Sequence, residues 1–565
     1  MKKYYDSTIL GKDYEKSMNK SERKERGSFY TPYFIVEYIA KNTLANLNVR
    51  LNPFVKILDP SCGSGYFLLE AYHILMKKFS EDLENIRMDH KDEEYVIETE
   101  NGFKNIGGLE YWQCSNLSYH ILKECIYGAD IDYKALELAK VNLRKKSGIN
   151  FNFKNNIICC NSLIKWEKDH FEDGTSHILK FWRQRYDYVM GNPPWVSLSR
   201  KHKKDIGESL KEYYSKSYKG NTYLPNLYEY FVKRTMEVLK MGGRFGFIIP
   251  DRLASNLQYK HFRKKLLEKY NIINVVFEIK FPEINTDTMI IIAENKYDGH
   301  NKIKVDVYKK CTYIIEQNDY IKNLNYELSY CHNIKGLDIK RFIDKDSMPL
   351  GKVCKTFTGF IGYKEKIDSV RTSSNQAEIL KGENIKRFQV LNNYYYDFTP
   401  YNLKGGTSDI KKLTSKNKVV IRKTGKYLIA ALDTEGRIIE QSLYGIICTD
   451  EKFSPYYILG LLNSKLIQWY YLNFLITNAN STPQIKKFSL DRIPVNNSSM
   501  TYIKNIETLA NKMVKQKGKN ITVERELNEA IFSLYNIDHN YRNIILKDIE
   551  NMIGLKKGGN NKWLL

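Results

Sequence analysis

The segment Asn192-Pro193-Pro194-Trp195 combines the chemical groups that could hold and orient a planar amine. The side-chain oxygen of Asn192 and the backbone carbonyl of Pro193 can each accept one N–H from the same amino group, which localises the lone pair of its nitrogen. The two prolines stiffen the loop and keep that carbonyl in place. Trp195 offers a flat face on which an aromatic ring can stack. A proline-rich turn with a buried tryptophan would have the same sequence, so the segment needs support from its surroundings.

A glycine-rich loop lies upstream, directly after an apolar strand predicted at residues 55–58. Glycines let the backbone approach a ligand closely, and the free N–H groups of the helix that follows favour anionic groups. A tight turn between a strand and a helix is the simpler explanation of a lone Gly-x-Gly. The candidate cofactor-binding residues of this loop are Asp59, Pro60, Cys62, Gly63 and Gly65.

Polar residues also follow the next two predicted strands. Asp130 ends the second strand, where a carboxylate can hold the two hydroxyls of a ribose. Asp132 is expected to cap the helix that follows. Asn161 and Ser162 come at the end of the third strand. These residues can meet only if the strands end at one common edge.

Alternating strands and helices between residues 55 and 293 provide such an edge. This rhythm predicts a doubly wound, parallel α/β sheet with its sites at the carboxyl ends of the strands. Residues 80–118 read as a polar insertion, and 81–100 carry nine acidic and two basic side chains. We therefore expect the insertion to face away from a polyanion. Further strands are predicted at 125–129, 156–160, 186–190, 244–249, 274–277 and 289–293.

The order of these segments resembles that of γ-group adenine-N6 DNA methyltransferases. The string from Asp59 to Phe67 resembles their S-adenosylmethionine loop, and Asn192 to Trp195 resembles their catalytic motif. Gly27-Ser28-Phe29-Tyr30-Thr31-Pro32 resembles the segment that opens the group. The resemblance covers residues 25–295. It implies a Rossmann-like S-adenosylmethionine-dependent domain that methylates the N6 amine of a flipped adenine.

The resemblance also implies roles for residues around the cofactor, S-adenosylmethionine, and no metal is expected. Tyr30, Thr31 and Pro32 would pack over its methionine end, with Thr31 capping the next helix and Pro32 at its first position. Ile131 would lie against its adenine ring. Asn161 stands where the family usually has Asp, and its amide oxygen would accept from the adenine amino group.

Two further roles concern the target base. Asn192 would contribute to both the catalytic and the cofactor site. Trp195 would stack on one face of the flipped adenine, and Phe281 matches the position of an aromatic residue that covers it in the family.

Beyond residue 300 the pattern changes to short β-rich pieces and helical pairs. Thr356 to Gly362 and Leu459 to Ser464 resemble the C-terminal specificity domain of monomeric Type II adenine methyltransferases. The resemblance implies a C-terminal α+β DNA-recognition domain. The expected divisions are an N-terminal arm at 1–25, a catalytic domain at 26–300, a target-recognition domain at 301–500 and a helical segment at 501–565.

Charge points to double-stranded DNA as the partner. The 565 residues include 89 Lys and Arg against 65 Asp and Glu, a formal net charge of +24. A general lysine bias explains part of this, but residues 401–430 hold eight basic side chains and one acidic, and residues 200–220 interleave seven basic side chains with tyrosines. Such clusters suit phosphates and stacked bases. The candidate DNA-binding residues are Arg200, Lys201, Lys203, Lys204, Lys416, Lys418, Arg422 and Lys423.

Other features concern the cellular context. The nine cysteines are scattered, which fits a reducing compartment and argues against a zinc site. No apolar run approaches the roughly 18 residues that span a bilayer. We expect a monomeric, cytoplasmic bacterial protein near the nucleoid, with no membrane contact. Only 26 residues precede Gly27, too few for a nuclease fold, so any restriction endonuclease is expected to be a separate protein.

Other functions stay open at this point. A modification subunit of a multi-subunit restriction-modification complex would need a separate DNA-reading protein. Methyltransferases acting on RNA or on protein glutamine share the Asn-Pro-Pro motif, although they are usually shorter. A DNA-binding protein without catalysis would have no use for the complete loop and motif.

Overall fold

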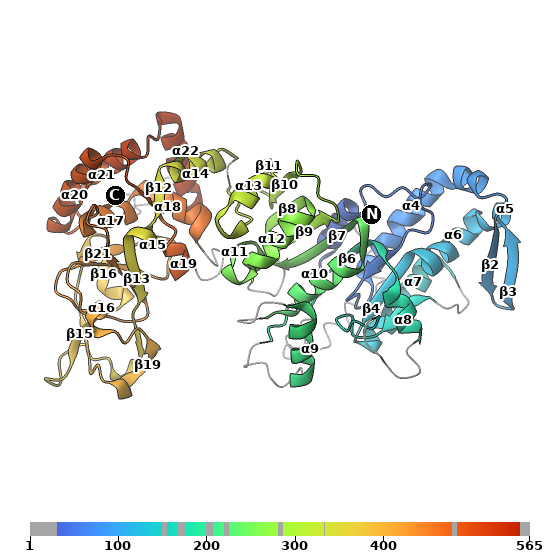
Figure 1. The fold of residues 1–565 in the computed structure, drawn as a ribbon, viewed down its shortest axis with the longest axis horizontal. Coiled ribbons are helices and arrows are strands. Elements are labelled where there is room, and N and C mark those ends of the chain that lie inside the picture. Colours follow the sequence, from blue (N-terminus) through green and yellow to red (C-terminus); the bar gives the residue numbers. More distant parts are fainter. Residues whose placement is uncertain are drawn as a thin grey trace. The chain divides into compact units, whose positions relative to one another are not determined.

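The computed structural model describes residues 31–149, 155–167, 176–198, 207–219, 225–280, 286–332, 334–476 and 483–553. The chain divides into two compact units, Met1–Ser329 and Tyr330–Leu565, whose elements are labelled in Figure 1. Each unit is considered by itself. Among the described residues, no helix is both long and apolar enough to cross a membrane.

A nine-stranded mixed sheet forms the centre of the first unit, in the order β11-β10-β8-β9-β7-β6-β1-β4-β5. The strands from β5 to β7 in this order are parallel neighbours. β1 is buried along its whole length, as expected of a strand covered on both faces. The strands are β1 Ile57–Asp59, β4 Ile126–Asp130, β5 Asn156–Cys159, β6 Tyr186–Gly191, β7 Leu239–Pro250, β8 Asn271–Ile279, β9 Thr288–Glu294, β10 Lys302–Val307 and β11 Cys311–Glu316.

The sheet is not parallel throughout, which corrects the prediction from sequence. β9 pairs antiparallel with both β7 and β8, and β11 pairs antiparallel with β10. The reason lies in the connections: eight residues join β8 to β9 and three join β10 to β11, whereas a parallel crossover needs a dozen or more. β8 and β10 nevertheless run in the same direction as β6 and β7, so all four end at the same edge.

Helices cover both faces of this sheet. α3 lies against Gly246 of β7, where a Cβ would meet the Thr43 hydroxyl at 2.1 Å and Ile39 at 3.0 Å. Since side chains alternate along a strand, Phe245 points to the other face, where its ring meets that of Tyr270 after α12. The helices are α3 Tyr33–Thr43, α4 Tyr66–Asp89, α5 Gly108–Tyr111, α6 Cys114–His120, α7 Tyr133–Ser147, α8 Ser176–Arg183, α9 Glu208–Tyr218, α10 Leu227–Val238, α11 Arg252–Ser255, α12 Lys260–Lys269 and α13 Gln317–Lys322.

The predicted insertion at 80–118 is partly an extension of the core. α4 continues to Asp89, and a hairpin of β2 (Glu94–Thr99) and β3 (Gly102–Gly107) follows. Trp112 is fully buried and contacts the rings of Phe79 and His120. The exposed residues of the hairpin include the apolar Val96 and Phe103 besides acidic side chains, and Ile106 packs into the core of the first unit. The acidic composition of the segment therefore does not show how the hairpin is anchored.

The second unit joins a four-stranded sheet, β13-β23-β20-β21, to a group of C-terminal helices through one core. Its strands are β12 Ser347–Pro349, β13 Cys354–Thr358, β14 Phe360–Gly362, β15 Ala377–Leu380, β16 Ile385–Lys386, β17 Gln389–Val390, β18 Tyr394–Tyr396, β19 Leu403–Gly406, β20 Lys418–Arg422, β21 Ala430–Asp433, β22 Ile438–Ile439, β23 Leu443–Cys448 and β24 Pro494–Asn496. Its helices are α14 Ile334–Lys345, α15 Leu350–Val353, α16 Ile410–Leu413, α17 Pro455–Leu462, α18 Lys465–Tyr470, α19 Lys487–Leu490, α20 Met500–Lys515, α21 Ile521–Leu534 and α22 His539–Ile553.

Two of the expected divisions change. The boundary lies at 329/330 rather than at 300, because β10 and β11 extend the first sheet. Residues 501–553 do not form a separate segment, since Ile506 and Ile531 share one core with Ile421 of β20.

Candidate active site

The carboxyl ends of β1, β4, β5 and β6 bring the predicted site residues to one edge of the first unit. These strands are parallel neighbours in the order β5-β4-β1-β6. Asn161, Asp130, Asp59 and Asn192 stand at or just after their last residues. The sheet therefore brings these four residues to one edge, as the sequence predicts.

Asn192 is oriented by the segment that precedes α3. Its Nδ2 donates to Thr31 Oγ1 over 3.0 Å. Its Oδ1 is buried and accepts no hydrogen bond from the described residues. A buried acceptor without a donor is costly, so this oxygen is poised to accept an N–H from a ligand.

The predicted capping role of Thr31 is wrong. Pro32 occupies the N-cap position of α3, and no side chain caps that end. The Thr31 hydroxyl, itself buried, instead accepts from Asn192. Its partner lies 161 residues away in sequence, so local capping patterns give no sign of it.

The glycine-rich loop is tied to β4 by backbone N–H groups. Cys62 N–H donates to the Ala129 carbonyl over 3.0 Å, and Gly63 N–H donates to Asp130 Oδ2 over 2.8 Å. Gly63 has φ +50°, and a Cβ there would meet no atom within 4 Å, so the space beside it is open. Gly65 has φ +90° and precedes α4 in close contact with Ala139 of α7.

Asp59 links this loop to the Asn192 segment. Its carboxylate accepts from the Ser61 N–H over 3.0 Å and lies so close to Gly191 that a Cβ there would come within 2.6 Å of Oδ1. Burial, with a smaller contribution from the nearby Asp130 charge, raises the pKa of Asp59 well above its ordinary value. Burial also raises the pKa of Asp130. A cationic ligand would favour the ionised form of both.

Residues after β5 complete the edge. Asn161 Nδ2 donates to the Tyr214 hydroxyl of α9 over 2.8 Å, and its Oδ1 accepts from Leu163 N–H. Ser162 is buried and donates to the Pro60 carbonyl over 2.6 Å, so it supports the loop. Ile131 is 70% exposed. The predicted N-cap Asp132 is confirmed, since it accepts from two backbone N–H groups of α7.

The role of α9 is not visible in the sequence pattern. The interleaving with basic residues predicts stacking surfaces for its tyrosines, but Tyr214 and Tyr218 are buried. The Tyr214 hydroxyl positions Asn161, and the Tyr213 hydroxyl accepts from Lys165 N–H over 2.7 Å.

The predicted base-stacking residues are only partly described. Trp195 is half-buried and packs against the core of the first unit, while Pro193 is buried and Pro194 half-buried beside it. Tyr30 and Phe281 lie outside the described residues, as do Arg200, Lys201, Lys203 and Lys204.

Of the four candidate DNA-binding residues of the second unit, three are partly or fully buried. Lys416 is exposed, but Lys418 is completely buried and forms an ion pair of 2.5 Å with the equally buried Asp433. Arg422 donates to the carbonyls of Gly382 and Ile385. Lys423 contacts Thr358 Oγ1 and lies 4.4 Å from the Tyr444 ring centre, and burial lowers its pKa to about 8. Assigning Lys418 to DNA binding was therefore wrong, and of these four candidates only Lys416 is an exposed cation.

Two family matches agree with the geometry of these units. Residues 124–281 match the Eco57I restriction-modification methylase family, and residues 377–495 match the TaqI-like C-terminal specificity domain. The chain carries a restriction-modification methylase domain followed by a TaqI-like specificity domain. Asp130, Asn161 and Asn192 lie within the first matched segment, and β15 to β23 lie within the second. We call the first unit the methylase domain and the second unit the specificity domain.

Curated relatives point the same way. The chain is 25% identical over 431 residues to the Type II restriction enzyme and methyltransferase RM.Eco57I of Escherichia coli, covering 67% of this chain and 40% of that protein. It is 28% identical over 258 residues to the Type II methyltransferase M.BstVI of Geobacillus stearothermophilus (44% and 38%) and 25% identical over 288 residues to M.VspI of a Vibrio species (50% and 51%). The chain thus spans about half or less of the length of these relatives.

Solved structures share the fold. The Type IIL restriction-modification enzyme MmeI, solved in complex with DNA, superposes with a TM-score of 0.57 at 13% identity, over 97% of this chain and 82% of that one. The Type ISP enzyme LlaBIII, bound to DNA, gives a TM-score of 0.55 at 12% identity, over 86% and 39%. At this identity the likeness concerns the fold alone.

Proposed function

We propose that this chain is a site-specific DNA methyltransferase that transfers a methyl group from S-adenosylmethionine to the N6 amine of an adenine flipped out of duplex DNA. The observation that carries the proposal is Asn192 Oδ1, a buried acceptor that takes no hydrogen bond from the described part of the chain, together with the open space beside Gly63. An amine N–H would supply the missing donor. The relatives named as Type II methyltransferases support the same reaction class.

The edge of the methylase domain, a Rossmann-like arrangement in its parallel part, fits S-adenosylmethionine. When bound, the cofactor supplies an electrophilic methyl group on a sulfonium. Asp130 would accept from the ribose hydroxyls, Gly63 leaves room beside the loop, and the Asp59 carboxylate adds negative charge close to Asn192. Ile131, exposed after β4, offers an apolar face to the adenine ring.

The chain's own residues would activate the amine. Asn192 Oδ1 and the Pro193 carbonyl accept its two hydrogens, so the nitrogen lone pair is localised and aimed. Thr31 keeps Oδ1 facing the ligand because it takes the hydrogen bond of Nδ2. Trp195 would stack on the extruded base and offset part of the few kcal/mol that extrusion costs.

DNA contact by the specificity domain is assigned to a surface other than Lys418–Lys423. Tyr363 lies between two lysines, with Lys404 Nζ 3.8 Å and Lys366 Nζ 5.2 Å from its ring centre. Tyr401, on the short turn before β19, is 93% exposed. We call these four residues the Tyr363 surface. Lysines beside the half-buried Tyr363 ring, with the exposed Tyr401 ring in the same group, suit a nucleic-acid backbone and its bases.

The test is a methylation assay with Asn192→Ala. Full-length protein is incubated with S-adenosylmethionine and DNA from a methylation-deficient host, and N6-methyladenine is measured by nucleoside mass spectrometry. Losing one oriented acceptor should lower the rate by about a hundredfold or more, with cofactor affinity within about twofold by calorimetry. Asn101→Ala, on the exposed hairpin, is the matched control. A near wild-type rate in Asn192→Ala, or N4-methylcytosine as the wild-type product, would contradict the proposal.

A further inference from the structure

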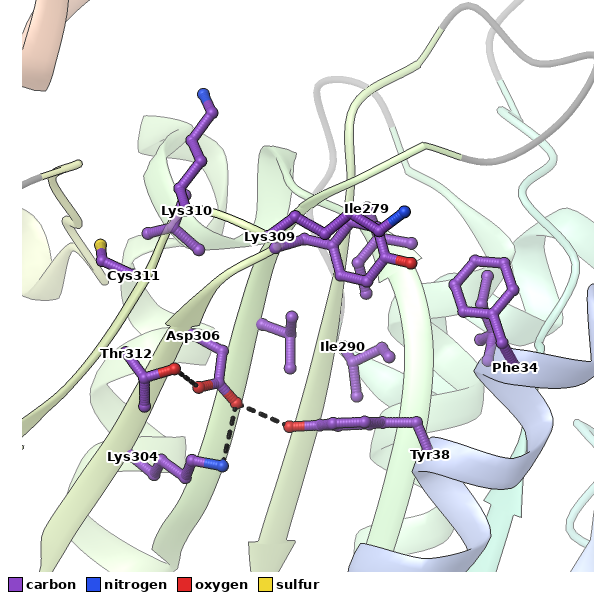
Figure 2. Close-up of a pocket in the computed structure, with 14 residues that line it drawn as sticks. Phe34, Tyr38, Ile279, Ile290, Lys304, Asp306, Lys309, Lys310, Cys311 and Thr312 are labelled. Carbon is purple, nitrogen blue, oxygen red and sulfur yellow. Dashed lines mark hydrogen bonds and ion pairs between the residues drawn. The ribbon is translucent and has the colours of Figure 1, made fainter.

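A cavity of about 460 Å³ lies in the methylase domain between α3 and the β10–β11 hairpin. Figure 2 shows Phe34 and Tyr38 of α3 on one side and Asp306 and Thr312 of the hairpin on the other. β8 and β10 end at the same edge as β6. Thr31, the partner of Asn192, precedes Phe34 by three residues. The cavity and the Asn192 site therefore both adjoin the start of α3.

The wall of the cavity is apolar and contains flat rings. Phe34 is 42% exposed although it is aromatic, and its ring stacks on that of Tyr308 with centres 5.8 Å apart. Ile279 and Ile290 form the floor (Figure 2). An apolar cavity with an exposed ring face suits a planar, aromatic ligand.

One end of the cavity is a fixed carboxylate. Asp306 accepts from the Tyr38 hydroxyl over 2.7 Å and from Thr312 Oγ1 over 2.6 Å, and Lys304 Nζ lies 3.3 Å away. Partial burial opposes ionisation, but the hydrogen bonds from Thr312 and Tyr38 and the charge of Lys304 prevail and lower the pKa of Asp306. An ionised, immobilised acceptor at this end suits a ligand edge that carries N–H groups.

The opposite rim is cationic and rigid. Lys309 stands at the tip of the β10–β11 turn with φ +59°, and its ammonium group lies 5.2 Å from the Tyr308 ring centre. Lys310 forms an ion pair of 2.6 Å with Glu278, which itself has φ +59° at a bulge near the end of β8. This ion pair ties the rim to β8.

We propose that this cavity binds a second nucleotide of the DNA, displaced from the stack close to the target adenine. Its base would rest on Phe34 with its N–H edge toward Asp306, and its phosphate would meet Lys309 and Lys310. A base with amino or imino hydrogens, a flat apolar face and an adjoining phosphate matches the carboxylate, the rings and the lysines in one ligand. The position near Asn192 favours DNA over a free nucleotide, and in this respect the inference rests on the proposed function.

The test uses photocrosslinking, which requires no methyl transfer. Full-length protein is irradiated with single-stranded oligothymidylate that carries one 5-iodo-2′-deoxyuridine, and the adducts are mapped by mass spectrometry. Adducts should form at Phe34 or Tyr308. Stacking of one base on an aromatic ring contributes substantially to affinity, so Phe34→Leu should weaken oligonucleotide binding about fivefold or more. Loss of one phosphate contact in Lys309→Gln should weaken it about threefold. Phe103→Leu and Lys302→Gln alter an exposed ring and an exposed cation outside the cavity and should leave binding unchanged.

The outcomes separate the two proposals. Retained S-adenosylmethionine binding shows that a variant is folded. The Asn192→Ala protein should keep the cavity adduct, and wild-type protein that forms this adduct but methylates no DNA would overturn the proposed function alone. Adducts located elsewhere, or binding unchanged in Phe34→Leu and Lys309→Gln, would overturn the cavity site. Thymidine 5′-monophosphate that binds as tightly as the oligonucleotide and abolishes the adduct would assign the cavity to a free nucleotide and overturn its DNA source.

Discussion

At the scale of single residues, the orientation of one amide group decides what the site can do. The Asn192 side chain carries both a donor and an acceptor, and only the acceptor oxygen can accept an N–H from an amine. Thr31 takes the donor, which leaves Oδ1 for the ligand. Under the proposed function Thr31 is a positioning residue, because it would act on the amine through Asn192.

Thr31→Val should lower kcat for DNA methylation by about three- to tenfold, the effect of one lost hydrogen bond. Thr31→Ser, which restores a hydroxyl, should recover most of the rate. A fall in kcat without rescue by Ser would mean that the threonine methyl group, and not the hydrogen bond, is what matters.

Asp59→Asn should stabilise the protein without ligand while weakening cofactor binding. Burial raises the folded-state pKa of Asp59, so the folded state binds its proton more tightly than the unfolded state does. Wild-type stability is therefore lost as pH rises from the unfolded value of about 4 through the raised folded value. Asn does not titrate, so the difference in Tm should vanish toward pH 4 and grow as the pH rises above it, at about 2–4 °C per kcal/mol. Equal pH profiles of Tm would show that Asp59 ionises freely.

The positions of the site residues were predictable from the sequence, but their hydrogen-bond partners were not. Asp59, Asp130, Asn161 and Asn192 are recognisable because each follows an apolar strand, and parallel strands end together. The sequence predicts a helix cap for Thr31 because a Thr-Pro pair before a helix is typical of capping, and nothing local indicates its bond to Asn192.

At the scale of elements, a lysine in a basic run of the sequence can lie on the surface or in the core. Lys418 and Asp433 are directly opposite each other in the β20–β21 pair, and both side chains are fully buried. A basic run in the sequence shows that lysines are frequent but not which face of a strand they occupy. The mixed direction of the first sheet was missed for a similar reason: the short links after β8 and β10 carry that information, and the strand patterns do not.

Lys418→Ala should destabilise the specificity domain by about 3–5 kcal/mol, because it leaves the Asp433 carboxylate buried without its partner. Denaturant unfolding of the full chain, followed by a probe in the second unit, measures the change. Lys416→Ala, exposed two residues earlier, should change stability by less than about 0.5 kcal/mol. Similar effects of the two substitutions would contradict the buried pair.

At the scale of the whole molecule, catalysis and sequence reading are expected in one chain. The order of a methylase domain before a specificity domain was predictable, because the motifs occur in that order in the sequence. The boundary at 329/330 was not, since β10 and β11 resemble the β-rich pieces that follow them and only their pairing assigns them to the first sheet. If both functions reside here, no separate DNA-reading subunit is needed.

The purified chain alone should therefore methylate DNA at one defined sequence. We also expect the Tyr363 surface to set the strength of its DNA binding. Each lysine that contacts a phosphate contributes about one unit to the slope of log K against log salt. Lys366→Ala with Lys404→Ala should lower this slope by about two, measured by fluorescence anisotropy between 50 and 200 mM salt. Lys416→Ala, an exposed cation of the same domain, tests whether the effect is specific. A fall of about one unit for Lys416→Ala would show that the salt dependence is not specific to the Tyr363 surface. Methylation that appears only after a cell extract is added would instead indicate a modification subunit, because sequence reading would then depend on another protein.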